Sequence, residues 1–325
     1  MTKYIGRLVN VGLAKETVRG VAVAAAYWMP KTAVAFFDRT QKATSEMSYG
    51  VIGEGAQAYK VMEWAEGTIE TELNDKSFGL ILLAAFGTVT PSGPSDSAYT
   101  HTFTLQNDNQ HDSLTITLAD PDRTDQYALA MLDSLEFNVV PDEVVMVTAG
   151  FKARSGRQVA AASPSYSTTF NKFLGRHCNV KIATLTSGLA AATALNLKSL
   201  KFTINKNTVT NNVLGTVWPD DILNRKFEIS GEITLDLEDQ TYRQLMLDGS
   251  YRALRIQFTN TDVLIGASSR PSFTLDLSRV HFEGWEVDRP NDEIVNQKIT
   301  FRALFDATNG NIVNSCTLIN NVSSY

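Results

Sequence analysis

One pattern occurs twice in this chain and constrains its fold more than any other feature. The first copy, from Gly67 to Gly87, reads GTIETELNDKSFGLILLAAFG, and the second, from Gly231 to Gly249, reads GEITLDLEDQTYRQLMLDG. Each copy opens with apolar and polar residues in alternation, which is typical of a half-buried β-strand. Each then changes to an apolar spacing of three and four residues, which predicts a short amphipathic helix.

The helix signals in the first copy include both ends. Asn74 or Asp75 can cap the N-terminus, and Gly87 stands where a C-terminal glycine is expected. The predicted apolar face consists of Phe78, Ile81, Leu82 and Ala85 in the first copy and of Tyr242, Leu245 and Met246 in the second.

A second pair of matching segments lies downstream of these copies. Asp142–Ala153 reads DEVVMVTAGFKA and Asp292–Ala303 reads DEIVNQKITFRA. Two matches in the same order indicate an internal duplication. The first copy is the longer one between its two segments, so we expect its extra residues to lie in loops.

The remaining residues favour short strands separated by turns, so each copy is predicted to be mainly antiparallel β with one helix. The fold class is therefore α+β, mainly β, with a helix covering a sandwich or partly rolled sheet. The small, polar segment that begins at Arg154 has linker composition. We predict a first domain over residues 1–158, a linker over 159–172 and a second domain over 173–325. The polar stretch from Asp38 to Lys60 is predicted to be a long connection that serves as an interaction arm.

Composition excludes several classes of function. At 325 residues the chain can form two domains with a core each, and its net charge is −6 with no stripe rich in lysine and arginine. Tight nucleic-acid binding depends on basic side chains, so it is not expected. Cys178 and Cys316, one in each half, do not form a disulfide framework and are expected to be small buried hydrophobes. The apolar run from Val21 to Phe37 contains Pro30 and Lys31, so no membrane segment is expected.

The sequence predicts no enzymatic, metal or cofactor site. The four histidines lack metal-ligand spacing, and Asp120–Asp125 resembles half of a calcium loop without its central glycine or terminal glutamate. Glu66, Glu70 and Glu72 suggest paired carboxylates, yet the second copy keeps acidic character on that face without keeping the positions. Catalysis requires fixed positions, so a solvated strand face is the better interpretation.

The run EWAEGTIETELNDKSFGLILLAAFG (63–87), with Gly50–Gly55 before it and YTHTFTL (99–105) after it, resembles the tail tube proteins of long-tailed bacteriophages. The resemblance covers both copies and points to the two-domain branch of that family. It implies tandem β-sandwich or split-barrel domains, each flanked by a helix and related to type VI secretion tubes, with no active site. It also implies rings that stack into a hollow tube in the virion tail, assembled in the host cytoplasm. Such a tube surrounds the tape measure protein, meets terminator and distal tail proteins at its ends, and conducts DNA during ejection.

The residues agree with this resemblance in three respects. Open strand edges favour head-to-tail closure into a ring, and two fused copies would let three chains form a pseudo-hexamer. An acidic lumen would repel DNA, and the lumen-facing candidates are Glu70, Glu72, Glu232 and Asp236. The long polar segment could reach the next ring, and its candidates are Asp38, Lys42, Glu46, Tyr49 and Glu54.

Two alternatives remain open at this stage. A minor tail component such as a distal tail or terminator protein would form one ring instead of a polymer. A carbohydrate-binding or hydrolytic β-sandwich would present aromatic platforms beside carboxylates, whereas Trp28, Trp64, Trp218 and Trp285 occur singly.

Overall fold

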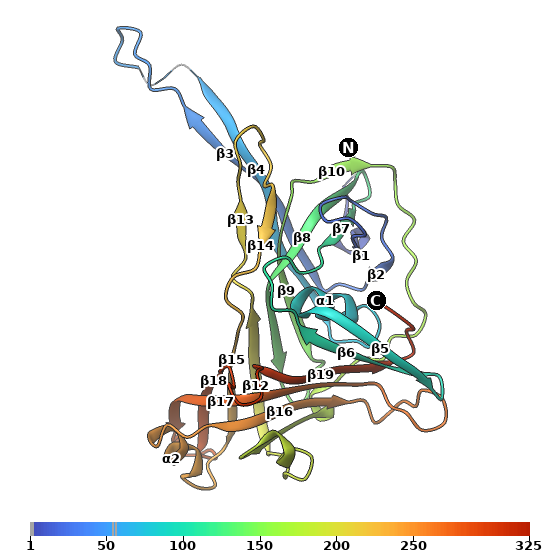
Figure 1. Cartoon of the computed structure of the whole chain (residues 1–325), viewed down its shortest axis with the longest axis vertical. Helices are drawn as coiled ribbons and strands as arrows, with labels where there is room; N and C mark the ends of the chain where they lie inside the picture. The colour runs from blue at the N-terminus through green and yellow to red at the C-terminus, as the bar shows by residue number, and fades with distance from the viewer. Residues whose placement is uncertain (1–2, 54, 56) are drawn as a thin grey trace.

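The computed structural model describes residues 3–53, 55 and 57–325 and confirms a mainly β fold with two helices (Figure 1). In the first half, the elements are β1 (Asn10–Lys15), β2 (Tyr27–Met29), β3 (Ala33–Thr44), β4 (Ala58–Glu72), α1 (Phe78–Phe86), β5 (Gly87–Ser95), β6 (Ala98–Leu105), β7 (Leu114–Ala119), β8 (Thr124–Val139), β9 (Met146–Ala153) and β10 (Arg157–Val159). In the second half, they are β11 (Cys178–Ala183), β12 (Leu197–Asn205), β13 (Val209–Asn211), β14 (Asp221–Leu223), β15 (Glu228–Asp236), α2 (Thr241–Leu247), β16 (Arg252–Thr259), β17 (Ser272–Asp288), β18 (Asn296–Ala303) and β19 (Val313–Asn320).

Eight antiparallel strands form one continuous run through both halves, in the order β3-β4-β9-β8-β12-β15-β18-β17. The long strand β8 belongs to two sheets, because its first part pairs with β7 and β10 and its second part pairs with β9 and β12. In the second half β17 behaves in the same way, with β16 and β19 along its first part and β18 along its second. The pairing of β8 with β12 joins the two halves within the run.

The recurring glycine of the sequence pattern has the same role in both halves. Gly67 lies opposite Phe151 in the β4–β9 ladder, and Gly231 lies opposite Phe301 in the β15–β18 ladder. A Cβ on Gly67 would lie 2.0 Å from the carbonyl oxygen of Ala35 on the other neighbouring strand. A Cβ on Gly231 would similarly lie 2.5 Å from the Lys201 carbonyl oxygen. Both positions therefore require glycine because the adjacent backbone passes too close for a side chain.

Matching β-bulges give a second correspondence between the halves. The β8–β9 ladder shifts register between Leu132 and Ser134, and the β17–β18 ladder shifts at the corresponding place, just before Gly284. After each bulge a glycine on one strand lies opposite a serine or threonine on the other. In the first half Ser134 of β8 lies opposite Gly150 of β9, and in the second half Gly284 of β17 lies opposite Thr300 of β18. Since bulges bend and twist a strand locally, the two halves bend their long strand at the same point.

The C-terminal stop of helix α1 agrees with the sequence, but its predicted N-cap and amphipathicity are wrong. The helix begins at Phe78, and its N-cap residue Ser77 makes no side-chain capping bond, so Asn74 lies in the turn that precedes the helix. The Asn74 side-chain oxygen accepts hydrogen bonds from the backbone N–H groups of Lys76 (3.0 Å) and Ser77 (3.1 Å). Gly87 ends the helix in the left-handed conformation, with a φ of 93°. All nine helix residues are buried, because strands of both halves and the C-terminal segment surround the helix. Helix α2 is peripheral, and of its residues only Leu245 is buried.

Aromatic side chains from both halves meet in one hydrophobic core. Phe78 of α1 packs edge-on against Phe137 of β8 (5.7 Å between ring centroids) and against Phe273 of β17 (5.4 Å). Phe137 also stacks on Phe202 of β12, with 4.1 Å between centroids. Aromatic pairs add stabilisation beyond the area that they bury. The core is therefore shared by the two halves.

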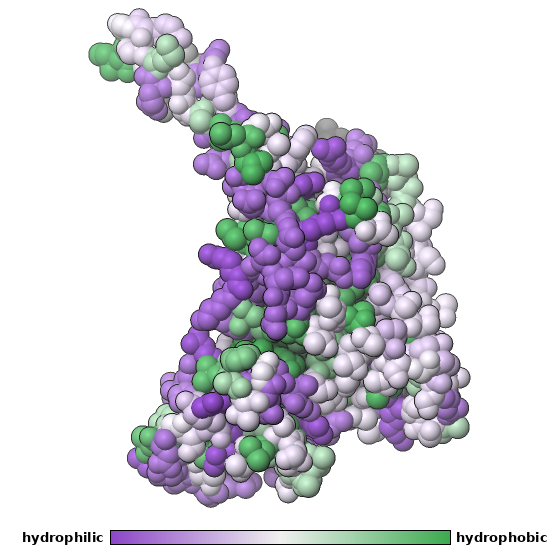
Figure 2. Space-filling view, in the orientation of Figure 1, coloured by the Kyte–Doolittle hydropathy of each residue, from purple (hydrophilic) through white to green (hydrophobic). Residues whose placement is uncertain are grey.

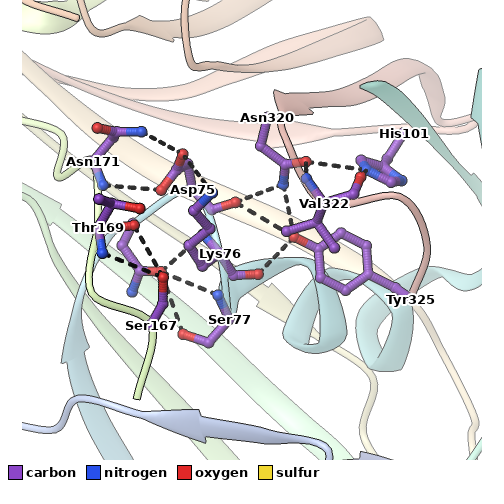
Figure 3. A network of polar contacts seen from close by, with 11 residues as sticks. Asp75, Lys76, Ser77, His101, Ser167, Thr169, Asn171, Asn320, Val322 and Tyr325 are labelled. Atoms are coloured by element: carbon purple, nitrogen blue, oxygen red, sulfur yellow. Dashed lines mark hydrogen bonds and ion pairs between the residues drawn. The ribbon is translucent and has the colours of Figure 1, made fainter. Parts of the chain in front are cut away.

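A buried polar network ties the start of α1 to the segment before β11 and to the C-terminal segment (Figure 3). The fully buried Asp75 carboxylate accepts hydrogen bonds from the backbone and side-chain N–H groups of Asn171, at 2.9 and 2.6 Å. Asn320 donates to the Asp75 backbone carbonyl, and the Tyr325 hydroxyl donates to the Lys76 carbonyl, both at 2.5 Å. Burial raises the pKa of Asp75. These bonds offset the cost of burying polar groups and anchor two crossing segments at one helix end.

Two predicted connections are strands instead. Both ends of the stretch from Asp38 to Lys60 are paired strands of a projecting arm, since β3 continues to Thr44 and β4 begins at Ala58, while residues 45–57 connect the two strands (Figure 1). Its outer part is exposed on both faces, so its sequence lacks the apolar alternation of a half-buried strand. The extra residues of the first copy include the β5–β6 hairpin, which has no counterpart between α2 and β16. This hairpin pairs through β6 with β19 of the second half.

Candidate assembly surfaces

The four lumen-facing candidates lie on one face of the eight-strand run, opposite the core. On β4, Ile69 and Thr71 are buried, while Glu70 and Glu72 alternate with them and are partly exposed. On β15, Ile233 and Leu235 are buried, and Glu232 and Asp236 occupy the partly exposed alternate positions. Because β4 and β15 belong to the same continuous run, period-two alternation places all four carboxylates on the same side.

Basic side chains on neighbouring strands pair with several of these carboxylates. Lys298 pairs with Glu232 at 2.8 Å, Lys198 pairs with Asp236 at 3.4 Å, and Lys172, which lies outside the strands, contacts Glu72. On the same face, Lys201 pairs at 2.9 Å with Glu136, a further carboxylate on β8. The hydrogen bond to Glu232 raises the pKa of Lys298, and the bond to Glu136 raises the pKa of Lys201. The face is therefore a mosaic of both charge signs with an acidic excess. Sequence reasoning missed the lysines, because their pairing depends on which strands are neighbours.

The inter-ring candidates divide between the base and the tip of the β3–β4 arm. Asp38 lies near the base, where its carboxylate accepts a hydrogen bond of 2.8 Å from the backbone N–H of Gly156, so it supports the arm from inside the chain. Lys42 lies further out on β3, and Glu46 and Tyr49 lie in the tip loop. Glu54 lies outside the described residues.

The arm tip carries apolar side chains that no residue in the described part of the chain covers (Figure 2). Tyr49 is 72% exposed and Met47 is 70% exposed, and Val51 and Ile52 are also exposed. The β13–β14 hairpin projects beside the arm in Figure 1 and carries the exposed Leu214 in its loop. The same loop contacts the arm through a hydrogen bond of 2.7 Å from the Glu63 N–H to the Val217 carbonyl. Clustered exposed apolar residues mark interaction surfaces.

Several titratable side chains outside the charged face are buried or hydrogen-bonded within the fold. Burial lowers the pKa of His111 to about 4, and burial raises the pKa of the Cys178 thiol to about 12. His101 contacts the Asn320 side chain at 3.1 Å and the Val322 carbonyl at 2.8 Å, within the polar network of Figure 3. Over residues 3–53, 55 and 57–325, no three His, Cys, Asp or Glu side chains converge as a metal site would require. In the same part of the chain, no helix has the length and apolarity to cross a membrane.

Comparison with known protein families assigns the chain to one family. The sequence model of the phage tail tube protein family matches residues 6–303, which include both halves and every strand of the eight-strand run. No curated protein matches the chain significantly. The chain therefore belongs to the phage tail tube protein family and is a structural component of a phage tail.

Proposed function

We propose that three copies of this chain close into a pseudo-hexameric ring and that such rings stack into the tube of a long-tailed phage. The observation that carries this proposal is the eight-strand run, which has a core on one face, charges on the other and an open strand edge at each end, along β3 and along residues 284–288 of β17. A head-to-tail contact that joins the two ends of such a run produces a closed ring. The matched registers and bulges of the two halves support an internal duplication, with repeats over residues 1–158 and 173–325 joined by residues 159–172.

The diameter expected for the closed barrel is large enough for a conduit. Three chains would contribute eight strands each to one barrel. With a strand spacing of about 4.8 Å and a tilt of about 40°, such a barrel has a backbone diameter of about 50 Å. This leaves room inside for the tape measure protein and later for DNA.

The charged face would line this lumen, because the opposite face is already covered by the core. Its acidic excess would repel DNA phosphates, while its ion pairs keep the wall from becoming strongly repulsive to the tape measure protein. Glu70 is the clearest test position because no ion pair involves it within the described part of the chain. Tubes with Glu70→Lys are expected to retain DNA in a filter-binding assay at low salt, and Glu70→Gln tubes much less. Equal retention by wild-type and Glu70→Lys tubes would show that Glu70 does not contact DNA in the tube.

The exposed arm tip favours a stacked tube over a single-ring component such as a distal tail or terminator protein. Tyr49 and Ile52 would insert into the adjacent ring, together with the charged arm residues Lys42 and Glu46. Burying two such side chains stabilises a contact by roughly 2–4 kcal/mol.

Negative-stain electron microscopy tests both levels of assembly. Wild-type protein at high concentration should form stacked rings with a central hole and three-fold or pseudo-six-fold end views. The Tyr49→Ser/Ile52→Ser variant should form rings that stack poorly, with its unfolding temperature unchanged. If wild-type rings never stack, the single-ring alternative is correct. If the double variant stacks normally, the arm does not join the rings.

A further inference from the structure

Each end of the eight-strand run has a strand edge that is not paired with another strand. In the part of the chain that the structure describes, β3 pairs only with β4, and residues 284–288 of β17 pair only with β18. Unpaired strand edges readily accept another strand unless they are covered. A ring of these chains needs some contact between the two edges, and many registers are sterically conceivable.

The chain contains an internal template for this contact. Where the halves join, β8 pairs antiparallel with β12, and Phe137 lies opposite Phe202. The bulges identify β8 as the counterpart of β17, so Phe137 corresponds to Val287. Strand β3 is the counterpart of β12, because each passes close to the recurring glycine of its neighbouring strand. Phe36 of β3 lies opposite Gly67, and Phe202 of β12 lies opposite Gly231.

We propose that β3 of one copy pairs antiparallel with the end of β17 of the neighbouring copy, in the register of the β8–β12 junction. This inference rests on the proposed ring and specifies its contact. Transferred to the open edges, the register places Phe36 opposite Val287 on the core face. On the charged face it places Phe37 opposite Glu286 and Ala35 opposite Asp288.

The burial of side chains at these edges agrees with this register. Phe36 is largely buried and Val287 is partly buried, so their pair would extend the apolar layer that Phe137 and Phe202 form inside the chain. Phe37, on the charged face, is 54% exposed. A neighbouring strand would cover part of its ring.

The two helices supply an independent argument. Helix α1 lies over the internal junction, where Lys206, the residue after β12, donates a hydrogen bond to the Ala84 carbonyl. Second-half residues thus help to bury α1 completely. Helix α2 occupies the corresponding place beside β17 but keeps Leu247 58% exposed. In the proposed contact, the neighbour's β3 and the residues that follow it would lie near α2, as β12 and Lys206 lie near α1, and would cover this side chain.

Cysteine cross-linking under mild oxidation tests the register directly. Ala35→Cys/Asp288→Cys is expected to form disulfides between copies, because residues directly opposite in a ladder have Cβ atoms about 5 Å apart. Ala33→Cys/Glu286→Cys is the matched control, since it lies on the same face four residues out of register. Asn138→Cys/Lys201→Cys, the internal equivalent of the first pair, should form its disulfide within one chain. Burial keeps the native Cys178 and Cys316 thiols unreactive.

Non-reducing gels and electron microscopy of the same samples separate the outcomes. A gel ladder for Ala35→Cys/Asp288→Cys that ends at three chains, with intact rings, supports the contact and its register. Rings that cross-link through Ala33→Cys/Glu286→Cys instead overturn the register and leave the ring standing. Absence of rings together with absence of cross-links, while the internal pair oxidises, overturns both the contact and the proposed function.

Discussion

Buried Lys206 should make the stability of the folded chain depend on pH near neutrality. Its side chain is 1% exposed and its ammonium group donates to the Ala84 carbonyl near the end of α1. Burial lowers the pKa of Lys206 to about 7, and the nearby positive charge of Arg19 acts in the same direction. An unfolded lysine has a pKa of about 10.4.

The sign of the effect follows from proton binding. Between about pH 7 and pH 10 the unfolded chain holds a proton on Lys206 that the folded chain has released, so raising the pH favours folding. Below pH 7 both states are protonated, and the full cost of the buried charge persists. Integrating between the two pKa values, stability should rise by about 2 kcal/mol from pH 7 to pH 9.

Lys206→Met should abolish this rise. The variant removes the buried charge but leaves the Ala84 carbonyl without its donor, at a cost of about 1–3 kcal/mol. The net effect at pH 7 is an expected gain of about 1–3 kcal/mol, which should shrink by about 2 kcal/mol at pH 9.

Urea unfolding of the unassembled chain at pH 7, 8 and 9, followed by tryptophan fluorescence, measures both quantities. Lys42→Met changes an exposed lysine on the arm and serves as the control, with the wild-type pH dependence expected. Parallel pH profiles for wild type and Lys206→Met would refute the reasoning.

Two further predictions concern close packing and the polar network. Gly231→Ala places a Cβ against the Lys201 backbone and should lower the unfolding free energy by about 3 kcal/mol or more. Gly6→Ala is the control, because its Cβ would meet open space and its stability should not change. Equal melting temperatures of the two variants in calorimetry would contradict this prediction. Tyr325→Phe removes the hydroxyl that bonds the Lys76 carbonyl and should lower the free energy of urea unfolding by about 1–3 kcal/mol. An unchanged urea midpoint for Tyr325→Phe would show that the C-terminal segment does not secure the helix.

The sequence predicts those parts of the fold whose signals are local. Alternation along β4 and β15 identifies both strands and the shared face of Glu70 and Glu232, because a strand with one buried face has a fixed period. The helix stop at Gly87 is also local, since it depends on a few adjacent backbone groups.

The rest depends on contacts between distant segments. The burial of α1 on every side comes from second-half residues such as Phe273, which no pattern within the helix can indicate. The arm was predicted as a connection because its strands project beyond the core and are exposed on both faces. The pairing of Lys298 with Glu232 depends on which strands are neighbours, and periodicity does not determine strand order.

Joining two units in one chain changes how a ring can assemble. Under the proposed duplication, half of the junctions in a ring of three chains form within a chain, where the linker keeps the partner strands at high effective concentration. Those junctions carry contacts that the junctions between chains lack, such as the pairing of the β5–β6 hairpin with β19 and the anchoring of Tyr325 at α1. The internal junction can therefore form during folding and remain intact, while the thinner β3–β17 contact can stay open until copies meet. A fused chain can thus form half of its ring junctions during folding and the other half during assembly, whereas an unfused unit forms all six during assembly.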